Sequence, residues 1–378
     1  MEGYTTAKIS SSAVRHNVRL LKSRLGAGVK FCPAVKANCY GHGIEFVLPS
    51  LAFADCMAVA DPSEAIELRN AGWSKDILVF FSPCAHGREQ STREALEELI
   101  VANVTVTVIA PDDVEQVAQA AKRINRHASV HLKIDSGMHR SGILAQRSSE
   151  MVHLLVKNSS VALTGMYTHF ATADEADKTY ALEQLKRFKD AANCCPRQGL
   201  ILHAANSAAL IDLPQSHLDM VRPGIAIYGY QPSDELHNKL PLRPAMRVMS
   251  RLMQVKDVPA GSSAGYNLTW KFDKPARLGL VSIGYADGYL RCFSNRACMR
   301  IGDDYLPVVG RVCMDQTILD VTSAPHARVG DAVEVISDDP AAPNSVENLS
   351  KLAGTIPHEI ICRLGRRIRR VARVDNET

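Results

Sequence analysis

The chain has 378 residues, which exceeds one ordinary domain and fits a large α/β barrel followed by a smaller domain. Its 44 Lys and Arg against 40 Asp and Glu give a formal net charge of +4, too small an excess to indicate a nucleic-acid partner. No apolar segment is long enough to span a membrane and the N-terminus lacks an apolar signal core, so we expect no membrane association and a cytoplasmic location.

Short β-rich runs alternate with helical patterns through the first part of the chain. We identify eight such runs, at residues 29–36, 57–60, 77–81, 104–109, 129–135, 162–169, 200–206 and 217–225. Segments such as "PSEAIELRNAG" and "PDDVEQVAQAAKRI" lie between them and carry helix start signals. This alternation predicts an α/β fold, a (β/α)8 TIM-like barrel. A doubly wound sheet remains the alternative, because strand order cannot be deduced from sequence.

Beyond about residue 240 the strands become longer and the helices fewer. We therefore predict a barrel domain over residues 10–240 and a mostly β domain over residues 241–378, with residues 1–9 pairing with the second domain. The turn-forming segment "QPSDELHNKLPLRP" marks the boundary. The basic tail at residues 363–373 alternates Arg with Ile and Val, which favours an exposed edge strand over a nucleic-acid site.

Polar residues stand where the predicted barrel strands end, and barrel enzymes carry their chemistry at these ends. These residues are Lys36, Lys133, His169, Asn206 and Arg222. Lys36 is either a surface charge or an amine that attacks a carbonyl, a role that burial and neighbouring cations favour. The loop "AANSAA" and the backbone of Gly224 and Ile225 offer donors for a phosphate.

The chain contains ten cysteines without a CxxC pair or a Cys/His metal spacing. Cys194 and Cys195 are adjacent in sequence, which suits neither a disulfide scaffold nor a zinc site. The pattern indicates reduced thiols in a cytosolic protein and no metal.

Eight motifs occur in order between residues 34 and 316 and resemble those of the alanine racemase family. They are "AVKANCYGHG", "HLKIDSGMHRSG", "YTHFATAD", "HAANSAA", "VRPGIAIYG", "SAGYNLTW", "IGYADGY" and "GRVCMDQ". The resemblance implies an isomerase that interconverts L- and D-alanine with pyridoxal 5'-phosphate (PLP). It also implies a homodimer with shared active sites and a barrel followed by a β domain, as predicted above. Biosynthesis and breakdown of D-alanine both remain open as the physiological role.

By this resemblance Lys36 binds PLP, and Lys36 and Tyr266 are the catalytic bases on opposite faces of the substrate. A tyrosine with a pKa near 10 is a poor base at neutral pH, so positive charge must lie near it. Tyr266 is expected to come from the second subunit. Arg222 is expected to meet the pyridine nitrogen, where an arginine cannot accept a proton and so favours racemisation over transamination.

The resemblance also assigns the other site residues. Further cofactor-binding residues are Tyr40, His169, Ser207, Gly224, Ile225 and His358. The substrate-binding residues are Arg140 and Met314. The corridor that leads substrate into the site contains Asp174, Tyr285, Arg311 and Asp315. Lys133 matches a lysine that is carbamylated in many members, and an unmodified lysine paired with Asp135 is the alternative.

His358, in "TIPHEI", departs from the family, which usually has tyrosine at this position. This departure leaves a serine or broad-specificity amino-acid racemase as the alternative function. A PLP-dependent decarboxylase of basic amino acids would require an acidic partner for the pyridine nitrogen, which "VRPG" does not provide. A non-catalytic PLP carrier would resemble the barrel alone.

Overall fold

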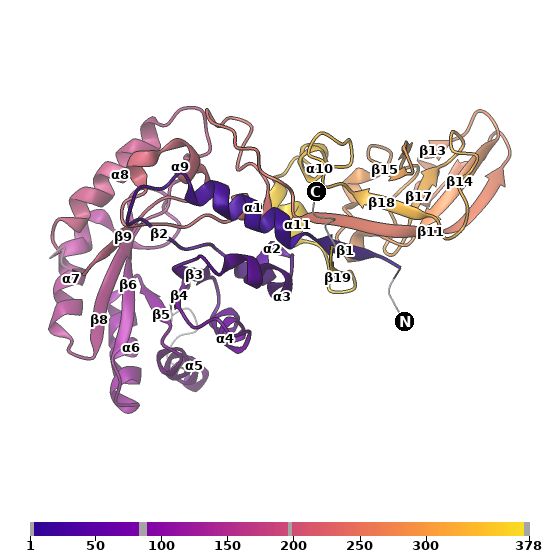
Figure 1. Ribbon diagram of the computed structural model, residues 1–378. Helices are drawn as coiled ribbons and strands as arrows, with labels where there is room; N and C mark the ends of the chain where they lie inside the picture. The colour runs from indigo at the N-terminus through magenta and orange to yellow at the C-terminus, as the bar shows by residue number, and fades with distance from the viewer. Residues whose placement is uncertain (1–3, 83–88, 196–198, 374–378) are drawn as a thin grey trace.

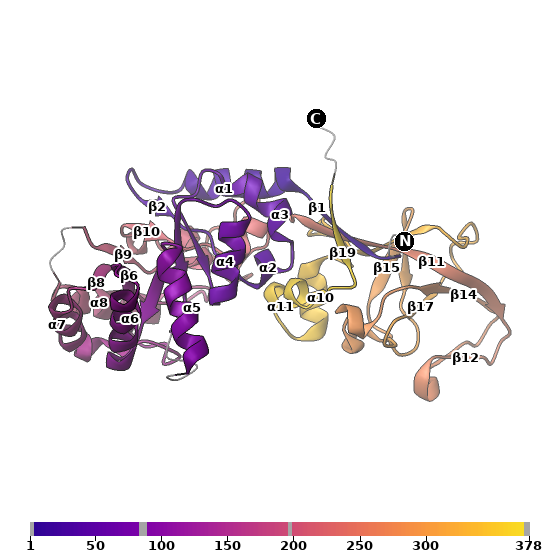
Figure 2. The ribbon, with the colours of Figure 1, turned by 90° about the horizontal axis from the view of Figure 1, so that it is seen from below.

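The computed structural model describes residues 4–82, 89–195 and 199–373 of the chain. Figure 1 shows two lobes, with the helix-covered strands of the N-terminal lobe at the left and the strands of the C-terminal lobe at the right. Helices α10 (Val346–Ala353) and α11 (Pro357–Cys362) lie between the two lobes, as Figure 2 also shows.

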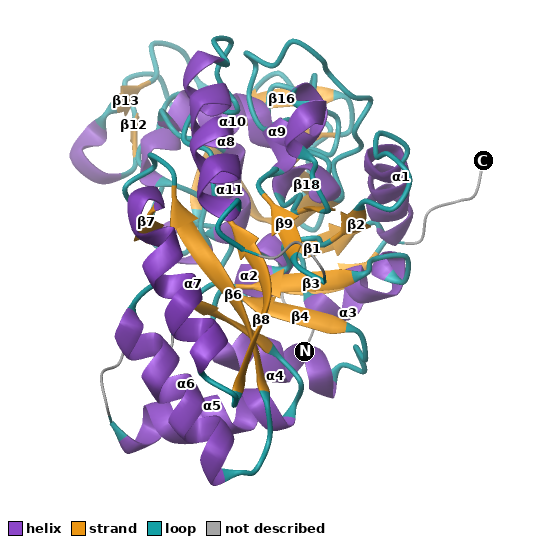
Figure 3. Ribbon diagram, turned by 90° about the vertical axis from the view of Figure 1, so that its left-hand side faces the viewer, coloured by secondary structure: helices purple, strands orange, loops and turns teal. Residues whose placement is uncertain are grey.

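The N-terminal lobe is a barrel. Within the described ranges, eight parallel strands follow one another in the order β2-β10-β9-β8-β6-β5-β4-β3. The sheet closes where Ala34 pairs in parallel with Ala58, and there the Val35 N–H donates to the Ala58 carbonyl at 2.8 Å. This closure confirms the predicted (β/α)8 barrel and excludes the doubly wound alternative. Figure 3 shows the barrel strands with the helices around them.

Each of the eight predicted runs overlaps one barrel strand, and the strand begins at most one residue before its run. The strands are β2 (Lys30–Phe31), β3 (Cys56–Val59), β4 (Asp76–Val79), β5 (Thr105–Val108), β6 (Ala128–Asp135), β8 (Val161–Tyr167), β9 (Ile201–His203) and β10 (Met220–Val221). A two-residue strand, β7 (Ile143–Leu144), pairs with the end of β6 outside this order. The short barrel strands are nearly all buried, which explains their continuous apolar runs.

Helices connect the barrel strands and cover them. They are α1 (Ser11–Lys22), α3 (Ile44–Val47), α4 (Pro62–Asn70), α5 (Gln90–Val101), α6 (Pro111–Arg123), α7 (Ser148–Lys157), α8 (Thr179–Ala192) and α9 (Ser207–Asp212). Helix α6 begins where the Asp113 carboxylate accepts the Ile109 N–H at 2.7 Å, and it buries Val114 and Val117 against the barrel. In the part of the chain that the structure describes, no helix is both long and apolar enough to cross a bilayer.

The C-terminal lobe consists mostly of strands, as predicted, and is built around the long strand β11. Its strands are β11 (Met246–Val258), β12 (Ser263–Ala264), β13 (Trp270–Lys271), β14 (Ala276–Val281), β15 (Cys298–Ile301), β16 (Asp304–Pro307), β17 (Thr317–Asp320), β18 (Ala332–Ile336) and β19 (Arg369–Ala372). β11 pairs with β18 along its first half and with β14 along its second half. β12 and β13 form a separate ribbon.

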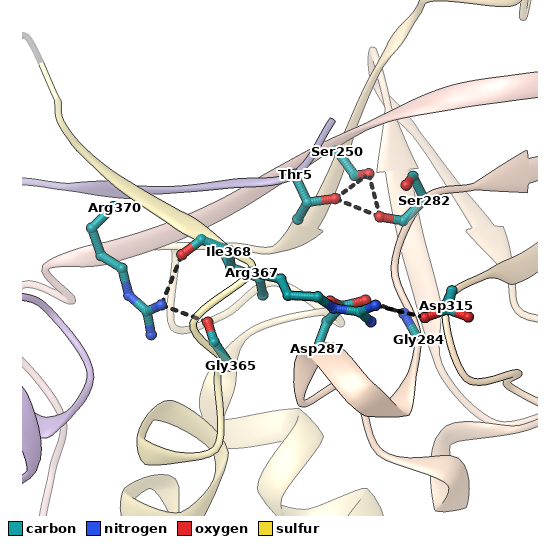
Figure 4. A network of polar contacts seen from close by, with 10 residues as sticks. All are labelled: Thr5, Ser250, Ser282, Gly284, Asp287, Asp315, Gly365, Arg367, Ile368 and Arg370. Atoms are coloured by element: carbon teal, nitrogen blue, oxygen red, sulfur yellow. Dashed lines mark hydrogen bonds and ion pairs between the residues drawn. The ribbon is translucent and has the colours of Figure 1, made fainter. Parts of the chain in front are cut away.

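The two ends of the chain meet in this second sheet. The first strand, β1 (Thr6–Ile9), pairs antiparallel with β11 and parallel with β19, which lies at the edge of the sheet. Thr5 anchors the start of β1, because its hydroxyl lies 2.8 Å from Ser250 Oγ and donates to the Ser282 carbonyl at 2.5 Å (Figure 4). The first and the last described strands, β1 and β19, therefore both belong to the sheet of the C-terminal lobe.

Candidate active site

Lys36, the expected cofactor lysine, begins a short left-handed turn, α2 (Lys36–Tyr40), and four residues separate it from the end of the first barrel strand, β2. The residues that follow it have positive φ angles of 53° at Ala37, 50° at Asn38, 55° at Cys39 and 52° at Tyr40. This conformation costs roughly 1–2 kcal/mol for each residue that carries a Cβ. A run of four such residues persists only where the surroundings hold it, and strain of this kind concentrates at functional sites.

Neighbouring side chains hold this turn. Glu64 on α4 accepts the Ala37 N–H at 2.6 Å. The buried ring of His42 has its Nδ1 atom 3.0 Å from the Cys39 carbonyl, and burial lowers the pKa of His42 to about 4. The imidazole is therefore neutral at pH 7, and its proton must lie on Nδ1 to reach that carbonyl. The turn fixes the positions of the side chains at its two ends.

The amine of Lys36 is electrostatically suited to react with a carbonyl. Lys36 is half-buried, and its pKa is lowered first by burial and second by the cation Arg140. A lower pKa increases the neutral fraction of the amine, which is the nucleophilic form. Burial and the neighbouring Arg140 therefore favour the reactive amine over the surface charge as the role of Lys36.

Donors for an anion gather where the Lys36 turn meets the loop after β10. The Ser207 hydroxyl accepts the Gly224 N–H at 2.8 Å and the Ala226 N–H at 3.3 Å, so its own hydrogen remains to be donated. A Cβ on Gly224 would lie 2.4 Å from the Tyr40 hydroxyl oxygen, so only glycine permits this approach. Within the described ranges, neither the Tyr40 hydroxyl nor the Ile225 N–H has a hydrogen-bond acceptor.

Arg222 follows strand β10, and its buried side chain belongs to a chain of hydrogen bonds. One Nη1 hydrogen points to Nδ1 of His203 at 2.8 Å, and Nη2 donates to the carbonyls of Thr168 at 2.7 Å and Ala204 at 3.1 Å. His203 Nε2 in turn lies 2.8 Å from Nδ1 of His131. Burial lowers the pKa of Arg222 to about 10, so the guanidinium remains a cation at pH 7.

Three residues of this region were missed from the sequence: His131, Tyr167 and His203. The parallel register places Tyr167 beside both Lys133 and His203, and the Tyr167 and His203 rings stack with centroids 4.8 Å apart. Gly165 lies opposite His131 and leaves room for its ring, since a Cβ there would lie 2.6 Å from that ring. The available signal was the period-two alternation of His131 with Lys133 along one strand, which places both on the same face.

The site is rich in positive charge. Burial is the largest cause that lowers the pKa of Lys133, to about 8, and the nearby cations Arg140 and Arg222 contribute. Burial and the same two arginines also hold the pKa of His169 well below its usual value. Lys133, Arg140 and His169 line one small hollow.

Asp135 offsets this positive charge only in part, because its carboxylate raises the pKa of Lys133 less than burial and Arg140 lower it. Among the described residues, Lys133 has no ion-pair partner. The carboxylate of Asp135, its expected alternative partner, instead accepts the N–H groups of Gly137 at 2.9 Å and His139 at 3.1 Å. The cluster of cations is therefore suited to bind anions.

A larger hollow of about 380 Å³ lies elsewhere, on the outer side of α1. Its lining includes Arg15, His16, Arg19 and Arg243. It shares no residue with the cation cluster around Lys36, so it does not belong to the candidate site.

His358, on α11, faces the Lys36 turn from the other lobe. Its ring centroid lies 5.9 Å from that of Tyr40. Burial and the nearby Lys36 lower the pKa of His358 to about 4, and its buried Nδ1 has no hydrogen-bond partner among the described residues. Glu359 does not hold this ring, because its carboxylate pairs with Arg363 at 2.6 Å and accepts the Thr355 hydroxyl.

Tyr266 does not join the Lys36 cluster within one chain. It starts a short 3-10 helix (Tyr266–Leu268) between β12 and β13, and Figures 1 and 2 place these strands at the end of the C-terminal lobe away from the barrel. Its side chain is 68% exposed. A Cβ on Gly265 would lie 3.0 Å from the backbone nitrogen of Arg311, so the residue before Tyr266 packs against the Arg311 backbone in this lobe.

The C-terminal lobe also carries three other residues expected at the site, Tyr285, Met314 and Asp315. The Tyr285 N–H donates to the Cys313 carbonyl at 3.0 Å, and the Met314 side chain is exposed. Arg367 links the carboxylates of Asp287 at 2.9 Å and Asp315 at 2.8 Å, which Figure 4 shows. Asp174 is exposed on the loop between β8 and α8 of the barrel.

Family models match nearly the whole chain. The model of the alanine racemase N-terminal domain matches residues 9–232, and that of the C-terminal domain matches residues 245–372. The chain is 38% identical to an alanine racemase of Desulfovibrio desulfuricans over 371 residues, which is 97% of each protein. It is 37% identical to an alanine racemase of Methanococcus maripaludis, again over 97% of each.

Solved structures show the same fold. The alanine racemase of Clostridium difficile 630 superposes with a TM-score of 0.91 at 35% identity, covering 100% of this chain and 97% of that one. An alanine racemase from Bartonella henselae with covalently bound pyridoxal phosphate gives a TM-score of 0.86 at 26% identity, with 98% of this chain and 100% of that one covered.

Proposed function

The chain belongs to the alanine racemase family, and from this premise we propose that it interconverts L- and D-alanine with PLP held by Lys36. The observation that carries the proposal is the half-buried Lys36, whose amine pKa is lowered by burial and by Arg140 more than the Glu64 carboxylate raises it, beside the second low-pKa lysine Lys133. Such a site favours a neutral nucleophilic amine and binds a phosphate and a substrate carboxylate.

The residues present fit each part of PLP. Lys36 would hold the aldehyde carbon, while Tyr40, Ser207 and the backbone of Gly224 and Ile225 would hold the phosphate. The Tyr40 hydroxyl and the Ile225 N–H have no hydrogen-bond acceptor among the described residues, which supports this assignment, as does the space kept open by Gly224. When bound, PLP supplies a conjugated ring that accepts the electron pair left when the substrate Cα loses its proton.

Arg222 would meet the pyridine nitrogen. Its described bonds use three of its five N–H groups, so the Nε hydrogen and one Nη1 hydrogen remain available. Because a guanidinium donates a hydrogen bond without giving up its proton, Arg222 would leave that nitrogen unprotonated. A weaker electron sink favours return of a proton to Cα over transamination. His169, kept neutral beside Arg222, would face the ring.

Inversion at Cα requires a proton-transfer group on each face of the substrate. We assign these roles to Lys36 and to Tyr266 from a second copy of the chain. The 68% exposure of Tyr266 supports a shared site, and the same lobe also exposes the large apolar side chains of Leu268, Tyr285 and Met314. Large apolar side chains left exposed on one lobe favour an interaction surface there. The proposed assembly is a homodimer with two shared sites.

Arg140 and the backbone N–H of Met314 would bind the substrate carboxylate. Lys133, with a pKa of about 8, is about one-tenth neutral at pH 7, far more than an ordinary lysine, and could add carbon dioxide, releasing one proton and leaving a carbamate anion beside Arg140. Four residues would line the substrate corridor: Asp174, Tyr285, Arg311 and Asp315. We place the enzyme in the cytoplasm, in keeping with the free thiols of the described cysteines.

A serine or broad-specificity racemase is the second candidate, and one observation favours it. The buried Nδ1 of His358 has no partner among the described residues and could meet a substrate hydroxyl. A decarboxylase is disfavoured, because Arg222 occupies the place of the acidic partner that such an enzyme needs at the pyridine nitrogen.

The test uses the purified full chain with PLP. Circular dichroism should show loss of the optical signal of L-alanine, and then of D-alanine in a separate reaction. Borohydride reduction followed by peptide mapping should place the pyridoxyl label on Lys36. An unchanged signal from both enantiomers, or a label on another lysine, would overturn the proposal.

A further inference from the structure

One arginine of the C-terminal edge strand reaches the Lys36 turn across the boundary between the lobes. Arg370 Nε donates to the Gly41 carbonyl at 2.9 Å, and these two residues are 329 positions apart in sequence. Its Nη1 donates to the carbonyls of Gly365 at 2.7 Å and Ile368 at 2.8 Å, as Figure 4 shows, and its Nη2 donates to Leu364 at 2.7 Å. One guanidinium thus binds four carbonyls from two segments, Gly41 in the barrel lobe and residues 364–368 in the C-terminal lobe.

The bonded carbonyls belong to two segments that meet beside the Lys36 turn. Gly41 ends the left-handed turn that carries Lys36 and Tyr40, and its N–H closes that turn on the Ala37 carbonyl at 2.9 Å. Leu364 follows the end of α11, the helix that carries His358. Arg370 therefore binds both the turn and the segment that directly follows the helix facing it.

The turn also packs directly against α11 at Gly41. A Cβ on Gly41 would lie 2.4 Å from the Ile361 carbonyl oxygen and 3.6 Å from Cys362 Cα. The two backbones are in close contact there, and only glycine permits it at a φ of 81°. A rigid donor at this junction fixes both their separation and their orientation.

The planar guanidinium suits this task. Its N–H groups form a fixed fork, whereas a lysine in the same place would present one compact ammonium on a flexible stem. Arg370 is half-buried and forms no ion pair among the described residues. The acceptors of its hydrogen bonds are backbone carbonyls. Charged donors make stronger bonds than neutral ones.

We propose that Arg370 is a positioning residue that holds the Lys36–Tyr40 turn against α11 and thereby sets the affinity of the site for the phosphate end of PLP. The cofactor part rests on the function proposed above, whereas the structural part does not. Arg370 touches neither substrate nor cofactor in this account, and it acts through Gly41 and the adjacent Tyr40.

The first test is amide hydrogen exchange of the full chain without added PLP. Arg370→Met keeps the length of the side chain and removes its donors. Exchange in residues 37–43 should rise roughly ten- to a hundredfold, the effect of losing a charged hydrogen bond. Exchange in residues 129–135 of the barrel should not change. The matched control is Arg366→Met, because Arg366 is exposed and has no hydrogen bond or ion pair within the described ranges.

The second test is the dissociation constant for PLP, followed by visible absorbance. It should rise about tenfold in Arg370→Met, less in Arg370→Lys, and not at all in Arg366→Met. Partial rescue by lysine distinguishes lost positioning from general destabilisation. If Arg370→Met does not fold, Arg370→Lys carries the test with an intermediate rise in exchange. Unchanged exchange at residues 37–43, or an equal effect in Arg366→Met, would overturn the proposal.

The two proposals fail in different ways. If the parent chain binds no PLP, the proposed function fails, while faster exchange at residues 37–43 in Arg370→Met still supports the structural role. If PLP binds Lys36 in the parent and exchange is unchanged in the variant, only the role of Arg370 is overturned.

Discussion

The guanidinium of Arg222 lies 2.8 Å from Nδ1 of His203, and this contact sets the protonation of two buried histidines. Arginine only donates, so His203 Nδ1 must be an unprotonated acceptor and its proton must lie on Nε2. That proton points to His131 Nδ1 at 2.8 Å, which is therefore also an acceptor. Burial and Arg222 lower the pKa of both rings, that of His131 to about 3. Arg222 thus keeps its full charge, since it has no ion pair with an acid among the described residues.

The first prediction follows from that charge. Arg222→Glu should place a proton on the pyridine nitrogen of bound PLP and deepen the electron sink. Racemisation of alanine should slow, and pyruvate with an equal amount of pyridoxamine phosphate should appear. Chromatography of the reaction products measures both. Arg222→Lys is the matched control, since it retains a cation and should form no pyruvate. Parental racemisation in Arg222→Glu without pyridoxamine phosphate would refute the electronic argument.

The second prediction concerns pH and stability. His42 is wholly buried, and burial lowers its pKa to about 4 in the folded state from an ordinary value of about 6.5. Between these values the unfolded chain binds more protons, so stability is complete above pH 6.5 and falls as the pH drops toward 4. The loss from this residue is about 1.4 kcal/mol per pH unit, or about 2 kcal/mol between pH 6.5 and 5.

The measurement is urea unfolding of the parent and of His42→Phe at pH 7 and pH 5. Phenylalanine keeps an aromatic ring against Tyr228, on which His42 now stacks with centroids 4.6 Å apart, but it cannot titrate. The loss of stability between the two pH values should be about 2 kcal/mol smaller in the variant. His153→Phe, on the exposed face of α7, should retain the parental loss. An equal loss in all three proteins would mean that His42 does not contribute.

The sequence predicted the barrel strands because each is a short apolar run between helix signals. It also predicted that Lys133, His169 and Arg222 would meet, because parallel barrel strands end at one face. The contact of His203 with His131 could not be predicted, since it depends on strand order and on the space beside Gly165. No local pattern marks the left-handed turn after Lys36, because Asn38 is its only residue type that favours this conformation. The left-handed conformation of this turn depends on contacts with residues far away in sequence, such as Glu64.

The third prediction concerns assembly. Lys36→Ala and Tyr266→Phe should each be nearly inactive, since a positioned acid or base contributes about 10²–10⁴-fold to a rate. After subunit exchange, a mixture of the two should regain activity, because a mixed dimer has one site with both bases intact. The coupled assay of D-alanine formation measures this, with exchange proven by mass spectrometry of tagged chains. No recovery in proven mixed dimers would show that both bases act within one chain.

The last prediction concerns His358 and the range of substrates. Its ring is neutral at pH 7, because burial and Lys36 lower its pKa to about 4, and its Nδ1 lacks a partner among the described residues. A substrate hydroxyl could donate to this nitrogen, and the histidine leaves more space than the family's usual tyrosine. We therefore expect measurable racemisation of serine beside that of alanine. A pocket change of this size alters discrimination by about 1–3 kcal/mol, or roughly 10–200-fold.

The test compares kcat/KM for L-serine with that for L-alanine in three proteins. His358→Tyr fills the space and should lower the ratio of serine to alanine clearly. His358→Phe removes the acceptor nitrogen without adding a hydroxyl, and it should lower the ratio as well if Nδ1 receives the serine hydroxyl. Since Glu359 is already paired with Arg363, no neighbouring carboxylate withdraws the histidine from this role. An unchanged or higher ratio in His358→Tyr would mean that the histidine does not set the substrate range, and alanine specificity would then be the better conclusion.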